Sequence, residues 1–501
     1  MNISTPISHW TDKHYFMALF LVYTAAHGGV LLIPNAIYWD DWTLYQVDRA
    51  IILDIFQQAG SMFNWAGHLH NTLLSVGPWL YRVLTFSLMF LAGVALSSIL
   101  EKHRFIEKET QFLVVLLFLI FPFYWARVAL IDIGYTVCYF LFFLAWAIIN
   151  KYPVISLLLF LLSFNTNSLL VFYALPILDL YIRSRKAPFS VNSLISFGLI
   201  KLHFLTLPFI YFWFKLTFFS PSGILEGYNE HYSALNLLIA PARTFIDLLR
   251  LQVPLLGAIL IGLLFYQSIK QIDHVGIGSV KDRKWFLYAG VLAIFFATFP
   301  YWILGHVPSF RDWSSRHQIL LPLGFSLVSV GLIVVLGKQI RAVVVTLLIS
   351  VSLALNAVTY IDFFKDWLKQ KELIELFRAS AELREADIVV FDDKTLALNG
   401  VDRTFRFYEW NGLMFQAFKD ERRMGLSQAE YELLELGRLP KSYFDHGKYF
   451  RMGDFQPTKS STGIRVAIES QPTSLSDKLS RFGLPILRLS YSKPFIIDFR
   501  P

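Results

Sequence analysis

Two adjacent aspartates, Asp40 and Asp41, stand between Trp39 and Trp42 in the stretch "IYWDDWTLYQ". They follow a long apolar run, at the mouth of an expected membrane helix, where charge is costly. A carboxylate that is partly shielded from water has a raised pKa and can remove a proton from a hydroxyl group. The pattern therefore predicts a general base at a membrane surface, with Trp39 and Trp42 as candidate acceptor contacts. The alternative is a solvated pair flanked by interfacial tryptophans.

A second polar group, "SFRDWSSRHQ", covers residues 309 to 318 and precedes another apolar run. Arg311, Arg316 and His317 would lie at the depth of lipid headgroups. Arginine binds phosphate through two parallel hydrogen bonds, so this group is a candidate site for a lipid phosphate. The alternative is that these side chains extend to the interface and anchor a helix end.

Weaker candidates fall on the same expected face. Arg127 could contribute to the phosphate site, although its position near Asp132 favours a simple ion pair between the two. Asn165, in "SFNTNS", could bind sugar hydroxyls, but asparagine at a helix junction is more often a cap.

Two further stretches on that face could contact an acceptor. His68 and His70 lie in "WAGHLHN", where a spacing of two does not place both rings on one helix face, so a metal site is weakly supported. The stretch "EGYNEHY" contributes Tyr228 and Glu230 as acceptor contacts, and a plain loop is an equal alternative.

The elements that must position these residues are membrane helices. The chain has 501 residues, of which 55% are hydrophobic and 17% aromatic, and only 16% carry charge. Apolar runs near the roughly 20 residues needed to cross a bilayer predict an α-helical polytopic membrane protein. We expect about eleven spans, at residues 14 to 35, 76 to 98, 111 to 126, 133 to 150, 153 to 164, 167 to 182, 196 to 218, 247 to 268, 285 to 304, 318 to 337 and 341 to 360.

The charged loops give an orientation. If the N-terminus is cytoplasmic, the Lys-rich stretches "EKHRFIEK", "IRSRK", "SVKDRK" and "GKQIR" all fall inside, as the positive-inside rule requires. The candidate residues then lie on the outer face. The only cysteine, Cys138, excludes disulfides and cysteine-based metal sites. The topology favours a multi-pass protein of a bacterial inner membrane, in contact with the lipid bilayer.

The composition changes near residue 360, so we expect a membrane domain at 1–360 and a soluble α+β domain at 361–501 on the outer, periplasmic side. Strands are predicted at 386–393, 404–410, 463–470 and 493–499, and a helix at 427–436. Asp392 and Asp393 are expected to form a turn. This part holds 22 Lys+Arg and 21 Asp+Glu, so the net charge of +8 lies almost entirely in the membrane part, which argues against a nucleic-acid partner.

The chain resembles the GT-C superfamily, membrane glycosyltransferases that use polyprenyl-phosphate sugars. The resemblance is carried by "YWDDW" after the first helix, by "GHLHNTLLSVGPW" leading to the second helix at Pro78, and by the late outer basic group with Arg311, Arg316 and His317. Similar size and layout occur in bacterial enzymes that modify O-antigen or other cell-surface polysaccharides during polysaccharide biosynthesis in the cell envelope.

The resemblance implies an inverting transfer from an undecaprenyl-type polyprenyl-phosphate donor to a cell-surface glycan or a lipid-linked acceptor. Asp40 or Asp41 would deprotonate the acceptor hydroxyl, and arginines would stabilise the departing lipid phosphate. No cofactor is required by this scheme. Asp41 could instead help to bind a divalent cation, and the residues leave this open.

Other functions would produce part of the same pattern. A transporter or flippase for a lipid-linked or polyanionic glycan is the alternative, and it should place charged residues at mid-span along a pathway. Most charged residues here lie at predicted helix ends. A membrane polysaccharide polymerase should have a large central outer loop, whereas the large outer segment here is C-terminal.

Overall fold

The computed structural model describes residues 11–184, 190–226, 232–249, 254–272, 280–310, 312–440, 442–453, 455, 463–470 and 495–500. The protein is mostly helical. The helices before the C-terminal domain are α1 (Asp12–His27), α2 (Arg49–Gln58), α3 (Trp65–Val76), α4 (Pro78–Leu100), α5 (Lys108–Ile120), α6 (Ile133–Ile148), α7 (Pro153–Ser163), α8 (Ser168–Phe172), α9 (Ala174–Ser184), α10 (Val191–Ile200), α11 (Leu202–Phe218), α12 (Asn236–Leu249), α13 (Leu255–Ile272), α14 (Val280–Ile303), α15 (Leu321–Ile333) and α16 (Lys338–Ala379).

Four of the described helical segments are long and apolar enough to cross a membrane: Asp12–Leu32, Pro78–Leu100, Lys284–Ile303 and Gln339–Ala379. A fifth is formed if α10 and α11, which meet at a bend of 66°, count as one span. These agree with five of the predicted segments. The molecule is therefore a candidate multi-pass membrane protein by helix length and hydropathy.

The remaining predicted spans form shorter helices. The predicted span 111–126 overlaps α5, and the predicted span 318–337 contains α15; each of these helices has 13 residues. The predicted span 167–182 is divided between α8 and α9. Helices of this length cover only about 20 Å, less than the roughly 30 Å of a bilayer core. The prediction of eleven spans thus exceeds what helix length alone supports.

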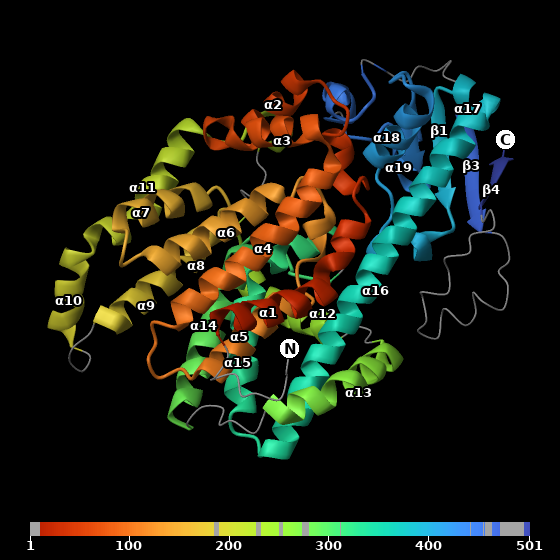
Figure 1. The fold of residues 1–501 in the computed structure, drawn as a ribbon. Coiled ribbons are helices and arrows are strands. Elements are labelled where there is room, and N and C mark those ends of the chain that lie inside the picture. The colour runs from red at the N-terminus through yellow and green to blue at the C-terminus, as the bar shows by residue number, and fades with distance from the viewer. Residues whose placement is uncertain are drawn as a thin grey trace.

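Two helices lie across one end of the bundle rather than along it. In Figure 1, α2 and α3 lie beside the C-terminal domain, at the same end of the molecule. The chain between α1 and α4 therefore caps this end of the bundle. Pro78 occupies the first turn of α4, where its missing N–H is not needed, so the second long span begins there.

The C-terminal domain is built on a small sheet of strands β1 (Ile388–Asp393), β2 (Met424–Ser427), β3 (Gly463–Ser470) and β4 (Phe495–Arg500), in the order β2-β1-β3-β4. Strands β2, β1 and β3 are parallel, and β4 pairs antiparallel with β3. Its helices are α17 (Ala381–Glu385), α18 (Phe407–Phe418), α19 (Gln428–Glu435) and α20 (Ser442–Asp445).

The predictions at β1, β3 and α19 are confirmed, and β4 overlaps the predicted strand 493–499. The predicted strand at 404–410 is wrong, because α18 begins there. Alternating aromatic residues indicated a strand, but the backbone N–H of Arg406 donates to the Glu409 carboxylate in a capping box that starts a helix. Strand β2 was not predicted, since four residues carry too little periodicity.

Helix α16 connects the two parts without a break. It has 42 residues, or about 60 Å, roughly twice the thickness of a bilayer core. The boundary predicted at residue 360 falls inside this helix. Its far end carries the C-terminal domain (Figure 1), so the domain is held by a continuous helix.

Buried ion pairs join the end of α16 to the C-terminal domain. The Arg403 guanidinium contacts the Asp366 carboxylate at 3.0 Å and also pairs with Glu409. The Lys369 ammonium donates to Asp393 at 2.6 Å. Asp393, expected only to form a turn, thus also anchors α16. These side chains are shielded from solvent, so the pairs restrict how the domain can lie on the helix.

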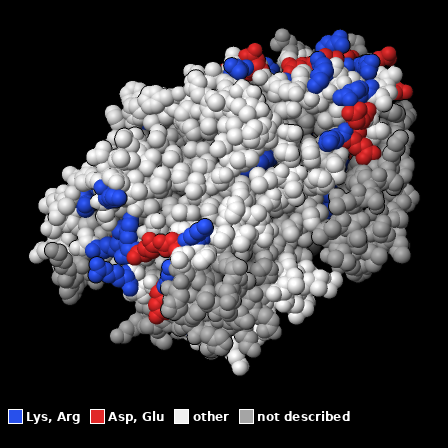
Figure 2. Space-filling model, in the orientation of Figure 1, with Lys and Arg blue, Asp and Glu red and all other residues white. Residues whose placement is uncertain are grey.

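Charged side chains are unevenly distributed over the surface. Figure 2 shows one group at the C-terminal domain and another at the opposite end of the same face, with a broad band between them that shows few charges. Exposed apolar side chains such as Leu158, Phe209 and Leu347 belong to helices between the two ends. This arrangement is typical of helices that face lipid.

Candidate functional site

The aspartate pair lies in the short 3-10 helix η3 (Trp39–Thr43). Trp39 adopts a left-handed backbone with φ of 49°, which is uncommon for a residue other than glycine. Its backbone N–H donates to the Glu409 carboxylate of α18 at 3.3 Å, and the Arg403 guanidinium lies 5.2 Å from the centre of its ring. The C-terminal domain thus holds the turn that presents the two aspartates.

Asp41 points into the protein and is fully buried. One carboxylate oxygen accepts the backbone N–H of Ile131 at 2.9 Å, and the other accepts that of Tyr38 at 3.2 Å. Burial raises the pKa of Asp41 to about 7, although the Arg82 guanidinium and the backbone N–H groups oppose this. Because its oxygens bind backbone groups, Asp41 serves to fix the loops.

Asp40 points the other way, into a pocket of about 330 Å³ between the membrane part and the C-terminal domain. One of its carboxylate oxygens accepts a hydrogen bond from the Tyr408 hydroxyl at 2.7 Å. The pocket is lined by Trp39, Asp40, Trp313, Arg406, Phe407, Tyr408, Glu430 and Tyr443. Of the two adjacent carboxylates, Asp40 is therefore the one that a ligand can reach.

The 3-10 helix η7 (Asp312–Gln318), which carries the basic group, reaches the Asp40 pocket through Trp313. The Trp313 ring meets the Trp39 ring edge to face, with centroids 5.2 Å apart. The Arg316 guanidinium lies 4.9 Å from the centre of the Trp313 ring. The fold thus brings together the two polar groups that the sequence singled out, across more than 260 residues of chain.

His317 supports Arg316. Its ring accepts a hydrogen bond from the Arg316 Nε at 3.3 Å, stacks on the His306 ring and packs at a tilt against the Tyr301 ring. Burial lowers the pKa of His317, and the Arg316 charge lowers it further. His317 thus lies behind Arg316 as its hydrogen-bond partner, and its contact with a phosphate stays a prediction.

Arg127 and Asp132 do not form the expected ion pair. The Arg127 guanidinium donates to the backbone carbonyls of Tyr124 at 2.9 Å and Phe123 at 2.7 Å, and to the His27 ring at 3.2 Å. This side chain is buried in the helical core, so it is not placed to bind a donor phosphate. Neither carboxylate oxygen of Asp132 has a hydrogen-bond partner among the described residues, and burial raises its pKa.

Trp42 lies under the C-terminal domain instead of facing an acceptor. Its ring is buried against Gly412 of α18, where a Cβ atom would come within 2.3 Å of the ring. The predicted acceptor contact at Trp42 is therefore wrong. The tryptophan packs in an apolar cluster that joins the helix ends to the domain.

The two histidines of α3 point in different directions, as their spacing indicated. His68 is exposed, whereas His70 is buried, stacks on Phe56 and bonds to the Tyr81 hydroxyl at 3.0 Å. Neither lines the pocket beside Asp40.

The Asn165 side chain donates to the Leu162 carbonyl at 2.9 Å and so closes the end of α7, in line with the capping alternative.

Three predicted contacts, Arg311, Tyr228 and Glu230, lie outside the described residues. Among the described residues, no group of three or more His, Cys, Asp or Glu side chains is arranged to hold a metal ion. Asp41, the residue suggested for this role, already accepts two backbone N–H groups.

Sequence reasoning missed the residues that the C-terminal domain contributes. Arg406, Phe407 and Tyr408 belong to the stretch that was read as a strand, and Tyr443 lies in the short helix α20. The Tyr443 ring stacks on Phe407 with centroids 4.0 Å apart. The available signal was Glu409, because an acidic residue is favourable in the first turn of a helix, where its carboxylate accepts the Arg406 backbone N–H.

Comparisons of the chain with protein-family models, with curated proteins and with solved structures found no match. The functional argument therefore depends on the geometry of the site.

Proposed function

We propose that this protein is an inverting glycosyltransferase that moves a sugar from a polyprenyl-phosphate donor to a glycan or lipid-linked acceptor at the membrane surface. The observation that carries the proposal is the placement of Asp40. Its carboxylate opens into a pocket at the end of the helical bundle, shared between the membrane part and the C-terminal domain. A lipid-held donor and a water-borne acceptor can meet there.

Asp40 would act as the general base. The acceptor hydroxyl oxygen attacks the anomeric carbon, a new carbon–oxygen bond forms, and its proton passes to the Asp40 carboxylate. The bond between the anomeric carbon and the phosphate oxygen breaks, and the polyprenyl phosphate leaves with the electron pair. Because phosphate is a good leaving group, this scheme needs one carboxylate and no separate acid.

The donor phosphate is expected on the side of η7. Arg316 is held there by the Trp313 ring and by His317, and Arg311 belongs to the same predicted group. A fixed guanidinium near the breaking bond would stabilise the charge that develops on the phosphate. This supports a lipid-phosphate leaving group over a neutral one.

The acceptor is expected on the side of the C-terminal domain. Aromatic rings of Tyr408, Phe407 and Tyr443 line this side of the pocket, together with Arg406 and Glu430. Flat aromatic surfaces beside a few polar groups suit a sugar ring, whose faces are apolar and whose edges carry hydroxyls. We place the protein in a bacterial inner membrane, with a cytoplasmic N-terminus and a periplasmic C-terminal domain.

The test is to replace Asp40 by Asn and to analyse the cell-surface glycan by mass spectrometry, beside the parent and a deletion strain. We expect the Asp40→Asn strain to lose the same single sugar as the deletion strain, at parental expression level. Asp392→Asn is the matched control, because Asp392 is an exposed carboxylate of the C-terminal domain outside the pocket. It should leave the glycan unchanged.

A glycan that is unchanged in the Asp40→Asn strain would contradict the proposal. If deletion also changed the distribution of a lipid-linked glycan across the membrane, the transporter or flippase alternative would replace it.

A further inference from the structure

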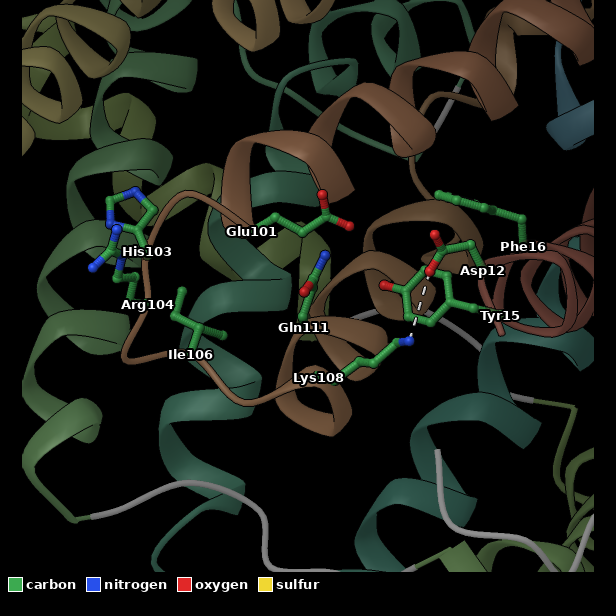
Figure 3. Close-up of a pocket in the computed structure, with 9 residues that line it drawn as sticks. All are labelled: Asp12, Tyr15, Phe16, Glu101, His103, Arg104, Ile106, Lys108 and Gln111. Atoms are coloured by element: carbon green, nitrogen blue, oxygen red, sulfur yellow. Dashed lines mark ion pairs between the residues drawn. The ribbon is translucent and has the colours of Figure 1, made fainter. Parts of the chain in front are cut away.

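A second pocket is formed by the start of α1, the end of α4, the loop that follows and the start of α5, and Figure 3 shows its lining side chains. Its charges do not converge on one point. The Lys108 ammonium is paired with the Asp12 carboxylate at 3.7 Å, and the Arg104 side chain lies beside His103, away from that pair. The buried charges behind the Asp40 site, by contrast, form one connected network.

The network begins at two residues of α16. The Phe363 carbonyl accepts a hydrogen bond from the Tyr38 hydroxyl, just before η3, at 2.6 Å. One turn later, the Asp366 carboxylate accepts the Arg403 Nε at 3.1 Å and the backbone N–H of Gly400 at 2.8 Å. The same stretch of α16 therefore holds the start of η3 and the loop that precedes α18.

Glu409, in the first turn of α18, connects this network to η3. One oxygen of its buried carboxylate accepts the backbone N–H of Trp39 at 3.3 Å and also pairs with Arg403. The other oxygen accepts the backbone N–H of Arg406 at 3.1 Å. A single carboxylate thus joins η3, the loop of Arg403 and the start of α18.

The peptide that Glu409 holds has a strained conformation. The φ angle of Trp39 is 49°, and a bulky residue adopts this left-handed region only where its surroundings hold it there. Asp40 is the next residue along the chain, so the conformation of Trp39 sets the direction in which the Asp40 side chain leaves the backbone. Relaxation of Trp39 would turn the Asp40 carboxylate away from the pocket.

The first turn of α18 also reaches the pocket itself. Phe407 lines it, and the Tyr408 hydroxyl donates to the Asp40 carboxylate at 2.7 Å. Neighbouring residues of one helical turn therefore line the pocket, contact the carboxylate and hold the peptide before it. The C-terminal domain acts on Asp40 from two sides.

We propose that Glu409 is a positioning residue for the Asp40 base, and that the C-terminal domain is thereby part of the transfer machinery rather than a separate binding module. Glu409 holds the Trp39 peptide, and the Trp39 peptide directs Asp40 into the pocket. The inference rests on the proposed function, because Glu409 has this task only if Asp40 is the base.

The experiment measures initial transfer rates of the purified full-length protein in detergent, with a lipid extract of the parent strain as donor and the glycan of the deletion strain as acceptor. Glu409→Ala should lower kcat by roughly 10- to 100-fold, because the Trp39 N–H loses a charged acceptor. KM for the donor should stay near the parental value. Glu409→Gln should recover part of the rate, because its carbonyl oxygen can still accept an N–H group.

Asp393→Ala is the matched control. Asp393 also belongs to a buried ion pair between α16 and the C-terminal domain, but it contacts Lys369, Thr395 and Asn399 rather than η3. This variant should have a lower melting temperature, and its kcat should stay near the parental value when measured below the unfolding transition. Glu409→Gln and Asp393→Asn make the same comparison where an alanine variant does not fold.

A parental kcat in Glu409→Ala, or an equal loss of kcat in Glu409→Ala and Asp393→Ala, would overturn the positioning role. Asp40→Asn, measured in the same assay, separates this failure from failure of the proposed function. If Asp40→Asn transfers sugar at the parental rate, Asp40 is not the base and both proposals are wrong. If Asp40→Asn is inactive and Glu409→Ala is fully active, only the role of Glu409 is wrong.

Discussion

Asp40 and Asp41 are neighbours in sequence with opposite environments. The left-handed backbone of Trp39 and the tight turn of η3 direct one carboxylate to the pocket and the other to the interior. Asp40 meets the Tyr408 hydroxyl, whereas Asp41 accepts the backbone N–H groups of Tyr38 and Ile131. In the proposed reaction Asp40 has the chemical role, whereas the contacts of Asp41 are structural.

The structural role of Asp41 predicts a pH dependence. Its pKa is raised to about 7 in the folded protein, so folding takes up a proton above the unfolded pKa of about 4. The contribution of Asp41 to stability therefore declines as pH rises from about 4 to 7. Asp41→Asn should remove this slope, and should cost about 1–3 kcal/mol because Asn has one acceptor for two N–H groups. Thermal unfolding of parent and variant in detergent, measured between roughly pH 5 and pH 8, would show this difference in slope. Parallel slopes for variant and parent would contradict the assignment.

In the proposed reaction, the hydrogen bond from Tyr408 positions the Asp40 carboxylate. Tyr408→Phe removes one hydrogen bond to the carboxylate, worth about 1–1.5 kcal/mol, and should lower kcat roughly tenfold. KM for the donor and the melting temperature should stay near the parental values. Steady-state transfer rates with a lipid-phosphate sugar provide the measurement. Tyr431→Phe, outside the pocket, is the control, and an unchanged kcat in Tyr408→Phe would refute the role.

Between elements, η3 and α18 fit together at one glycine. A methyl group at Gly412 would come within 2.3 Å of the Trp42 ring. Gly412→Ala should therefore destabilise the protein by about 1–3 kcal/mol, as overpacking in a core does. Gly337→Ala is the matched control, because no atom of the described chain lies within 4 Å of its added Cβ. Melting temperatures of the two variants test the fit, and equal values would contradict it.

The junction of α16 with the C-terminal domain depends on buried charge. Arg403→Gln leaves the Asp366 and Glu409 carboxylates without their shared cation, which should cost about 3–5 kcal/mol. Arg422→Gln, at a guanidinium that is 81% exposed, should cost less than about 1 kcal/mol. Denaturant or thermal unfolding compares the two, and a small loss in Arg403→Gln would show that the domain does not need this network.

At the scale of the molecule, the proposed topology places the Asp40 pocket and the start of α1 at opposite membrane surfaces. This predicts a labelling pattern in a Cys138→Ser background. A cysteine at Ser75, exposed on α3, should react with a membrane-impermeant maleimide on intact cells, whereas one at Lys151 should react only after permeabilisation. Reaction of both on intact cells would contradict the topology.

The sequence determined the features that depend on composition and local periodicity. Apolar length alone identified the spans at α1, α4, α14 and α16, since helices are required wherever backbone groups lack water. Strand β1 and helix α19 followed from short-range patterns. The residue types of the two polar groups, around Asp40 and Arg316, indicated where to look for a site.

Only the tertiary structure decided how these residues are used. Sequence periodicity does not say which of two adjacent carboxylates meets buried N–H groups, that Trp42 fills the space over Gly412, or that Arg127 donates to backbone carbonyls. Nor does it show that Tyr408 lies against Asp40, because 368 residues separate them. Such contacts depend on which surfaces the packed helices and the C-terminal domain bring together, and that is a property of the folded chain as a whole.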